Sequence, residues 1–564
     1  DLNDTVPLNK VSYGIFVRIE RCYEKCEFVC PDWVNVRWED NHLKARLNLM
    51  KSLDAHLTGD HLIEWEGNSS EKNLDPYVIA FAAWDFLKNR STIQETMADY
   101  KIVQVSENVI PPLSFRANGS IKLKLEDLVN ERTWEDSVAL GRVSIPQNFS
   151  RLLSIQDPLP LARPFGIPLR AMLTKECKNL FFAGASASST ELTSRSLGLP
   201  SCAAQMGAAS GMVASMCIEK NRLPKTLISK GYLDELARKF YRRSHSFSLV
   251  DNEDFDNLVL DAKVNASSTL EDWTASCNQV EQTILTKRCL IQFPVTSGAI
   301  EKLKVHLKAK ADQIFSVKIL EGSGYHNSIP GICLQSDLIQ VEGDPVCLEW
   351  FAKIVSCRSC WHFWEIVSEQ EFEIPLFSNG LVGFVLHNER AKSKGFKTKF
   401  FSDFEPILST TPAPSLSPKI EVYPKPDAYL PHNIANHSYR PNSLPGLWVS
   451  KPTDFKYPEF IELEWQEARL ISCVEISFDP SYDFIYPAKP TRMRDSNFQS
   501  LVKNYRLYVT DSDGKSKLLV DVCDNQVAFR SHSFDPVEAK GIELEVISTH
   551  GLNRAQIYQV RVYQ

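Results

Sequence analysis

Short apolar runs with the spacing of strands dominate the chain after residue 255. Polar and glycine-containing turns separate these runs, and the 3.6-residue period of a helix is scarce among them. The runs are Leu290–Phe293, Ile314–Ile319, Leu381–Leu386, Phe460–Leu463, Ile471–Phe478, Tyr505–Val509, Ile542–Val546 and Ile557–Tyr563. They predict two successive β-sandwiches.

The first part of the chain mixes helical and strand patterns. A helix is predicted at Pro76–Asn89, where apolar residues recur at every fourth position. Asp75 can cap this helix, and Pro76 suits its first turn. A strand is predicted at Tyr13–Ile19 and another helix at Asn41–Leu57.

Small residues are concentrated between residues 179 and 214. Asn179–Gly184 predicts a short apolar strand that ends at glycine, and Gly207–Ala214 predicts a helix with one nearly bare face. Glycine and alanine let another group approach a helix backbone closely. We therefore weigh a cofactor lying over the N-terminus of this helix against tight packing of the helix on a sheet.

Seven prolines with serine and threonine between residues 402 and 431 predict a semi-rigid linker. The fold class is therefore multidomain α+β, with two β-sandwich domains behind a mixed first part. The predicted domains are 1–228, a β-sandwich at 229–401, the linker at 402–431 and a β-sandwich at 432–564.

Composition narrows the classes of function. A chain of 564 residues needs several cores, and 43% hydrophobic with 24% charged residues is typical of globular proteins. A net charge of −7 disfavours nucleic acid as a partner. No apolar run approaches 18 residues, so we expect no membrane span. The start at Asp1, without methionine or a signal pattern, suggests a mature form or a fragment.

Two of the cysteine clusters could bind metal. Cys22, Cys26 and Cys30 would share one stripe of a helix, but iron–sulfur ligands usually come as Cys-x-x-Cys runs with a fourth cysteine. Cys357 and Cys360 could form a redox or zinc pair. Their strand-like aromatic surroundings favour a packed core, so neither cluster is assigned a metal.

Several segments resemble a known family. Pro164–Arg170, Asn179–Gly184 and Gly207-x-x-x-Gly211 resemble the C-terminal flavin-binding segment of FAD-dependent oxidoreductases of glutathione-reductase type. Ile63–Gly67 and Ala83–Asn89 resemble the Glu-Trp-Gly and Trp-Asp-x-x-Lys-Asn motifs of a bacterial multidomain group within that family. The resemblance implies that residues 1–228 are part of an FAD and substrate domain.

The end of the chain resembles the discoidin-like, or galactose-binding-like, module of the same bacterial group. The matching segments are Tyr505–Leu507, Arg530–Phe534 and Val560–Tyr563. The resemblance implies a carbohydrate partner for residues 432–564. Trp448, Tyr482 and Arg494 are the candidate contacts, against a purely structural role for the module.

The resemblance also implies a cofactor and roles for single residues. The implied cofactor is FAD, and the implied substrate is a polar small molecule. Glu191 would accept a proton during substrate oxidation, and Arg170 would fix an anionic group. The alternatives are a solvated carboxylate for Glu191 and a salt bridge for Arg170. Trp33, Trp65, Trp84 and Trp134 are candidate substrate contacts or core residues. The implied cofactor-binding residues are Gly184, Ala185, Ser188, Gly207, Ala208, Ala209 and Gly211.

Two departures from the family leave the function open. The Gly-x-Gly-x-x-Gly turn that holds the ADP half of FAD is absent, and Ala185 and Glu191 replace the family's arginine and histidine. The leading hypothesis is a fragment of an FAD-dependent oxidoreductase that acts on a polar small molecule such as a sugar. The alternative is a non-catalytic carbohydrate- or protein-binding protein derived from a flavoprotein. We expect a periplasmic or extracellular location rather than a cytoplasmic one.

Overall fold

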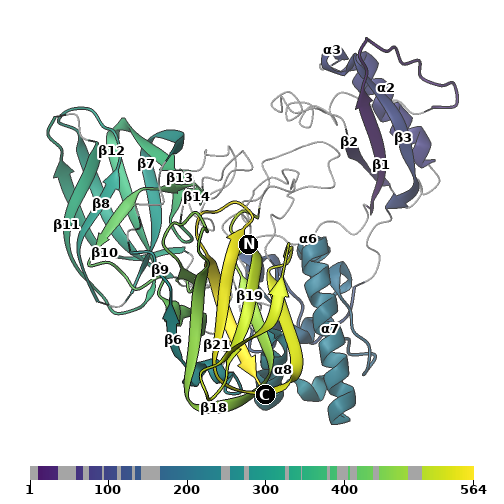
Figure 1. Cartoon of the computed structure of the whole chain (residues 1–564). Helices are drawn as coiled ribbons and strands as arrows, with labels where there is room; N and C mark the ends of the chain where they lie inside the picture. Colours follow the sequence, from purple (N-terminus) through teal and green to yellow (C-terminus); the bar gives the residue numbers. More distant parts are fainter. Residues whose placement is uncertain are drawn as a thin grey trace. The chain divides into compact units, whose positions relative to one another are not determined.

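The computed structural model divides into two compact units, Asp1–Val250 and Asp251–Gln564, each of which is described by itself. Figure 1 labels the helices and strands and colours the chain by residue number. The structure describes residues 11–35, 59–67, 75–91, 94–110, 116–129, 132, 134–141, 165–242, 254–271, 273, 279–296, 298–323, 329–343, 346–377, 381–389, 404–406, 416–435, 444–480 and 498–564. The predicted helix at Asn41–Leu57 lies outside these residues.

The first unit begins with a three-stranded antiparallel sheet in the order β2-β1-β3. Its strands are β1 (Val11–Arg21), β2 (Gly59–Gly67) and β3 (Tyr100–Ile110). Ile15, Val17 and Ile19 of β1 are buried and alternate with exposed residues, which confirms the predicted strand.

Helix α2 (Pro76–Asp85) continues as the π-helical turn η2 (Phe86–Arg90), and the short helix α3 (Gln94–Met97) follows. The side chain of Asp75 accepts a hydrogen bond of 2.9 Å from the backbone amide of Tyr77, so the predicted cap is confirmed.

Helices dominate the rest of the first unit. The elements are α4 (Leu125–Val129), β4 (Ser137–Gly141), β5 (Phe165–Pro168), α5 (Leu169–Met172), η3 (Gly184–Ser186), α6 (Glu191–Leu197), α7 (Pro200–Lys220), η4 (Pro224–Leu227) and α8 (Lys230–Arg242). Strands β4 and β5 pair antiparallel, and contacts join α7 to β4 and to η3.

The strand predicted at Asn179–Gly184 is wrong. Phe181 makes a single bridge to Leu173, and Gly184 then enters the 3₁₀ turn η3 with a φ of +66°. A left-handed residue ends an extended segment, and only glycine adopts that conformation at little cost.

The helix predicted at Gly207–Ala214 is confirmed, but it begins earlier, at Pro200. Leu199 is extended (φ −69°, ψ 143°), as a residue before proline prefers to be, and Pro200 occupies the first helical position. Gly207 and Gly211 therefore lie well inside α7, past its first two turns.

Helix α7 is also the helix within the described ranges that has the length and composition to cross a membrane. Its mean hydropathy reaches 1.2, and 28% of that window is buried. Core helices of soluble proteins meet the same criterion, so this is weak evidence for a span against the expectation of none.

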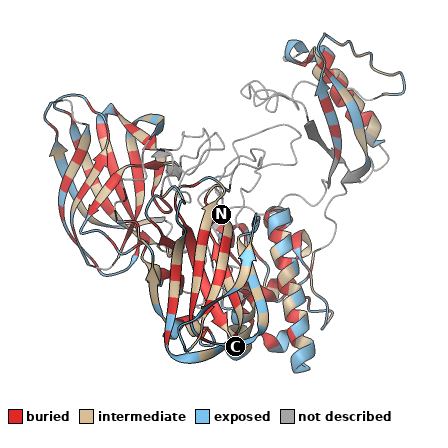
Figure 2. Cartoon of the chain, viewed as in Figure 1, coloured by how far each residue is buried: buried red, intermediate tan, exposed pale blue. Residues whose placement is uncertain are grey.

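The second unit contains the first predicted β-sandwich. One sheet has the order β10-β9-β12-β7-β13-β14, with β15 paired to β12, and the other has the order β11-β8-β16. Buried and exposed residues alternate along β11 (Figure 2). The strands are β7 (Val280–Val295), β8 (Gly298–His306), β9 (Ile314–Ser323), β10 (Ile329–Gln340), β11 (Cys347–Ser356), β12 (Cys360–Phe377), β13 (Val385–Glu389), β14 (Phe404–Pro406), β15 (Ser417–Pro418) and β16 (Ile420–Tyr423).

The proline-rich segment does not act as a linker over its whole predicted length. β15 and β16 lie within 402–431, and they pair with β12 and β8 of the sandwich. Ile420 and Val422 are buried, so this part of the segment contributes to the core.

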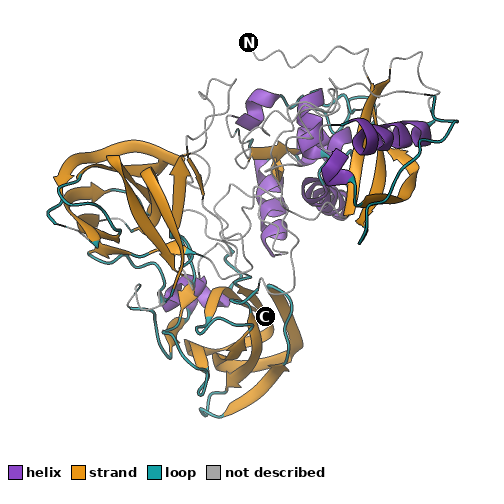
Figure 3. Ribbon diagram, turned by 90° about the horizontal axis from the view of Figure 1, so that it is seen from above, coloured by secondary structure: helices purple, strands orange, loops and turns teal. Residues whose placement is uncertain are grey.

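The end of the chain forms a seven-stranded antiparallel sheet around its own core. The path order is β17-β22-β18-β21-β19-β20, and β6 pairs with β18. Figure 3 shows the strands of the chain in orange and its helices in purple. A shift of register between Glu464 and Arg469 of β18 lets the sheet curve. The elements are η5 (Leu258–Asp261), β6 (Lys263–Ala266), η7 (Pro431–Ala435), β17 (Trp448–Val449), β18 (Glu459–Phe478), β19 (Val502–Thr510), β20 (Ser516–Val522), β21 (Phe529–Thr549) and β22 (Gln556–Tyr563).

Residues 254–271 belong to this last sheet rather than to the first sandwich, where the sequence placed them. Leu463 of β18 pairs with Val264 of β6, and the side chain of Asn257 accepts a hydrogen bond of 3.0 Å from the Val562 amide.

Candidate functional site

Backbone hydrogen bonds hold the segment that follows Gly184 from two sides. The carbonyls of Ser186 and Ser188 accept bonds from the amides of Ala117 (2.8 Å) and Leu123 (3.0 Å). On the other side, the amide of Ser188 donates to the carbonyl of Ala171 at 2.8 Å. Segments far apart in sequence therefore fix the course of this turn.

Gly184 lies against the beginning of α7. A Cβ atom at Gly184 would be 3.2 Å from the Cβ of Ala203, in the first turn of the helix. Leu199 provides no side-chain cap there, and the first amides of a helix have no acceptor within it. Amide donors and the positive end of the helix dipole therefore lie close to the Gly184 turn.

Polar atoms without partners are buried around the same turn. Ser196 is fully buried, and its Oγ has no hydrogen-bond partner among the described residues. Two buried atoms of half-buried residues also have no partner among the described residues, namely Nε of Arg116, which precedes Ala117, and Nε1 of Trp134. A buried polar group without a partner costs about 1–3 kcal/mol, and hydrogen bonds to a bound polar ligand would remove that cost. These atoms therefore suit a region that receives a polar ligand.

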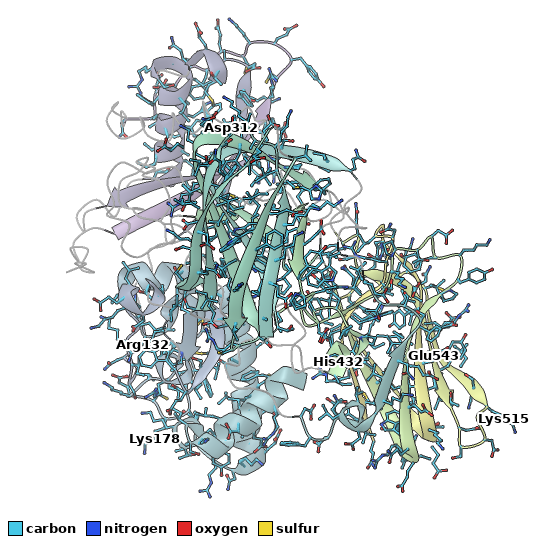
Figure 4. All side chains as sticks on the ribbon, turned by 90° about the vertical axis from the view of Figure 1, so that its left-hand side faces the viewer. Arg132, Lys178, Asp312, His432, Lys515 and Glu543 are labelled. Carbon is cyan, nitrogen blue, oxygen red and sulfur yellow. The ribbon has the colours of Figure 1, made fainter. Side chains whose placement is uncertain are left out.

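Arg170 binds the buried carboxylate of Asp136. Its Nε and Nη2 donate at 3.0 and 2.7 Å, and its backbone amide donates at 2.9 Å. The hydrogen bond to Asp136 raises the pKa of the Arg170 guanidinium. The ring of Trp134 lies 5.9 Å from this guanidinium and 3.8 Å from that of Arg132, which Figure 4 labels. Arg170 therefore forms a salt bridge with a buried carboxylate.

The family comparison agrees with the position of this turn. Residues 113–239 match the model of the FAD dependent oxidoreductase family. No curated protein matches the chain. The matched residues include Arg170, the Gly184 turn and all of α7.

Solved structures similar to part of the chain include carbohydrate-binding modules. A family 32 module from EndoD of Streptococcus pneumoniae has 19% identity and a TM-score of 0.20, and the match covers 25% of this chain and 90% of that one. A family 32 module from NanJ of Clostridium perfringens, in complex with galactose, has 18% identity and a TM-score of 0.16, with coverages of 21% and 76%.

The structure places the seven expected cofactor-binding residues in two groups. Gly184, Ala185 and Ser188 lie together in the turn, and Ser188 is buried. Gly207 and Gly211 lie inside α7, so their amides bond within the helix, and the expected position at a helix N-terminus was wrong. The positions beside them are Ala208, which is half-buried, and Ala209, which is buried.

Tight packing does not explain the two glycines either. A Cβ atom at Gly207 or Gly211 would meet no other atom within 4 Å, and both residues are exposed. The sequence also missed the uncapped start of α7, although Pro200 after Gly198 and Leu199 signals a helix start at that point.

Glu191 begins α6, but its side chain lies outside the described part of the structure. The tryptophan candidates separate by burial. Trp84 is a core residue, while Trp33 is 51% exposed and meets Phe81 edge-on at 5.3 Å. The side chain of Trp65 is not described.

Burial also excludes one of the candidate carbohydrate contacts in the C-terminal module. Trp448 is fully buried, and its Nε1 donates to the carbonyl of Ser268 at 2.9 Å, so it cannot meet a ligand in solution. Tyr482 and Arg494 lie outside the described residues. Tyr457, just before β18, is an exposed aromatic residue that the sequence analysis missed.

The Cys22 cluster lacks the helix that would have aligned it. Residues 22–35 are not helical. The thiol of Cys26 lies 3.1 Å from the carbonyl of Tyr100, and the buried ammonium of Lys88 lies 3.5 Å from the same sulfur. Lys88 also donates to the carbonyls of Met97 and Ala98, so this centre ties strands and helices of the first sheet together.

Proposed function

We propose that residues 113–239 form the C-terminal flavin-binding part of an FAD-dependent oxidoreductase that acts on a polar small molecule such as a sugar. The observation that carries the proposal is the Gly184 turn, which lies against the uncapped start of α7 and near the orphaned hydroxyl of Ser196. The family match over 113–239 supports the same region.

The residues of this region fit a flavin. Amides at the start of α7 and the positive helix dipole would stabilise an electron-rich ring edge. The hydroxyl of Ser196 would gain a partner. The bare backbone at Gly207 and Gly211 would allow a cofactor chain to approach α7 closely.

FAD, when bound, would accept the two electrons of substrate oxidation. We propose Glu191, at the start of α6, as the proton acceptor for that reaction, because it stands where the family has a histidine. Arg170 is not proposed to hold the substrate, since Asp136 already occupies its guanidinium.

The test is reconstitution of the full chain with FAD, followed by gel filtration and a visible spectrum of the protein peak. We expect retained flavin, and Ser196→Ala should reduce the retained fraction. The matched control is Ser210→Ala, because Ser210 donates to the carbonyl of Met206 within α7. A chain that retains no flavin, or a Ser196→Ala variant that binds like the wild type, contradicts the proposal.

A second candidate function is a non-catalytic binding protein derived from a flavoprotein. The observation that favours it is Arg170, because the cation expected at the substrate is bound to Asp136. Retention of FAD without reduction of the flavin by any member of a sugar and polyol panel would support this candidate over the enzyme.

We also propose that residues 432–564 bind carbohydrate, with Tyr457 as a stacking residue and a periplasmic or extracellular place of action. The proposal rests on the sequence resemblance and on the 75% exposure of Tyr457. Affinity electrophoresis in gels that contain a galactose-rich polysaccharide should show retardation that Tyr457→Ala abolishes and Phe498→Ala preserves. Equal mobility with and without the polysaccharide would contradict it.

A further inference from the structure

Three side chains with metal-binding atoms meet at one end of the first β-sandwich. Cys360 and His362 are two residues apart on β12 and so share one face of the strand. Glu321 of β9 is the direct cross-strand partner of His362. One ligand atom from each residue lies within 4.8 Å of the other two.

We propose that Glu321, Cys360 and His362 bind a divalent transition-metal ion of the zinc type. Thiolate, imidazole and carboxylate are the ligands that zinc takes in proteins, at about 2.0–2.3 Å. The Sγ of Cys360 also lies 3.8 Å from the imidazole ring of His362, at Nδ1, so the thiol and the ring are neighbours. Three protein ligands leave a fourth position for water, as in zinc sites that perform chemistry.

An unsatisfied buried nitrogen supports the site independently of this spacing. His362 is fully buried, and its Nε2 has no hydrogen-bond partner among the described residues. Its Nδ1 lies 3.3 Å from the carbonyl oxygen of Cys360. When Nδ1–H donates to that carbonyl, Nε2 keeps a lone pair for a cation, as is usual for histidines that bind metals.

Metal binding should release a proton. A cysteine binds a metal ion as the thiolate, so the Cys360 thiol would give up its proton when the ion binds.

Arg358 is the competitor at this site. Its Nη2 donates to Oε2 of Glu321 and to the carbonyl of Gly322, both at 2.9 Å. The arginine side chain is 54% exposed, whereas that of Glu321 is 14% exposed. Arg358 can therefore move into solvent when a cation takes the carboxylate, and its removal should strengthen metal binding.

The experiment is a titration of the chelator-stripped full chain with Co²⁺, followed by visible absorption. We expect one tight equivalent with tetrahedral d–d bands, a thiolate charge-transfer band and release of a proton into weak buffer. Cys360→Ala should abolish the charge-transfer band. Glu321→Gln should weaken binding by at least about tenfold, and Arg358→Ala should strengthen it.

Two cysteine variants serve as controls. Cys289→Ala removes another buried thiol of the same sandwich, and Cys357→Ser removes the exposed thiol three residues before Cys360, so both should keep the full spectrum. Circular dichroism checks that each variant is folded, and Glu321→Gln, at a partly exposed position, provides the answer if Cys360→Ala does not fold. The proposal is overturned if no stoichiometric band forms, if Glu321→Gln binds like the wild type, or if Cys357→Ser removes the band.

Discussion

Replacing Arg170 by alanine would leave the buried carboxylate of Asp136 without its cation. Asp136 is 1% exposed and accepts three hydrogen bonds from Arg170, two of them from the guanidinium. Removing one partner of a buried ion pair costs about 3–5 kcal/mol. Because the Arg170 side chain is 36% exposed, we take the lower end, about 3 kcal/mol of local stability.

The measurement is hydrogen exchange of the peptides that span β4, β5 and α5. Several cores unfold separately in a chain of this kind, so whole-chain denaturation would not report one transition. A loss of about 3 kcal/mol corresponds to a fall in protection of about 100-fold. Arg132→Ala is the control, because Arg132 is 55% exposed and should cost less than about 1 kcal/mol.

A double-mutant cycle decides whether the pair causes the loss. Asp136→Asn removes the charge that Arg170 neutralises, so the double variant should be at least about 1 kcal/mol more stable than the sum of the single changes predicts. A loss below about 1 kcal/mol for Arg170→Ala, or strict additivity, would refute the structural role and return Arg170 to the substrate candidates.

Three further outcomes follow from single residues. Gly184→Ala should cost about 1–2 kcal/mol in exchange protection of the turn, because alanine resists the φ of +66°, and a cost near zero would contradict the left-handed turn. Burial lowers the pKa of His387 to about 4, below its ordinary value of 6.5. As pH falls, the unfolded chain therefore takes up the proton before the folded chain does. The stability of the region around β13 should fall by up to about 3 kcal/mol between pH 6.5 and pH 4, and His387→Gln should flatten this dependence of stability on pH. Burial, Glu545 and Glu462 raise the pKa of Glu543, so its charged form destabilises the fold above its ordinary value of 4.5 (Figure 4). At pH 7, Glu543→Gln should therefore stabilise the last sheet by about 0.5 kcal/mol and raise its thermal midpoint. At pH 4 the substitution should have no such effect.

Local patterns predicted the elements whose stability is local. The alternation in β1 and the cap at Asp75 each depend on a few neighbouring residues, and both are confirmed. Asn179–Gly184 has an equally apolar pattern, yet a strand needs a partner along its length. Phe181 finds a single bridge, to Leu173, so the pattern alone could not decide the structure.

The sequence could not locate the domain boundaries, because strands that lie far apart in the chain pair with one another. β6 pairs with β18, almost two hundred residues later, and β16 joins a sandwich from within a proline-rich stretch. Neither pairing leaves a local mark, because the period of a strand does not say which strand it will meet.

The candidate flavin-binding residues also show what a local pattern can and cannot predict. The glycines of α7 were found correctly as bare backbone, but their place in the helix was not, since the start of a helix depends on the residues before it. Leu199 and Pro200 fix that start. The donors of the candidate site thereby move from Gly207 to the first turn of α7, beside Gly184.

Register, rather than spacing, also creates the proposed metal site. The Cys357-x-x-Cys360 spacing drew attention to the correct turn, but Cys357 is exposed, and the third ligand comes from β9. A shift of β9 by one residue against β12 would turn Glu321 to the opposite face of the sheet and leave His362 without its acidic neighbour. The site therefore depends on the same pairing that builds the core, and metal binding by Glu321 would itself report that the two strands have found their register.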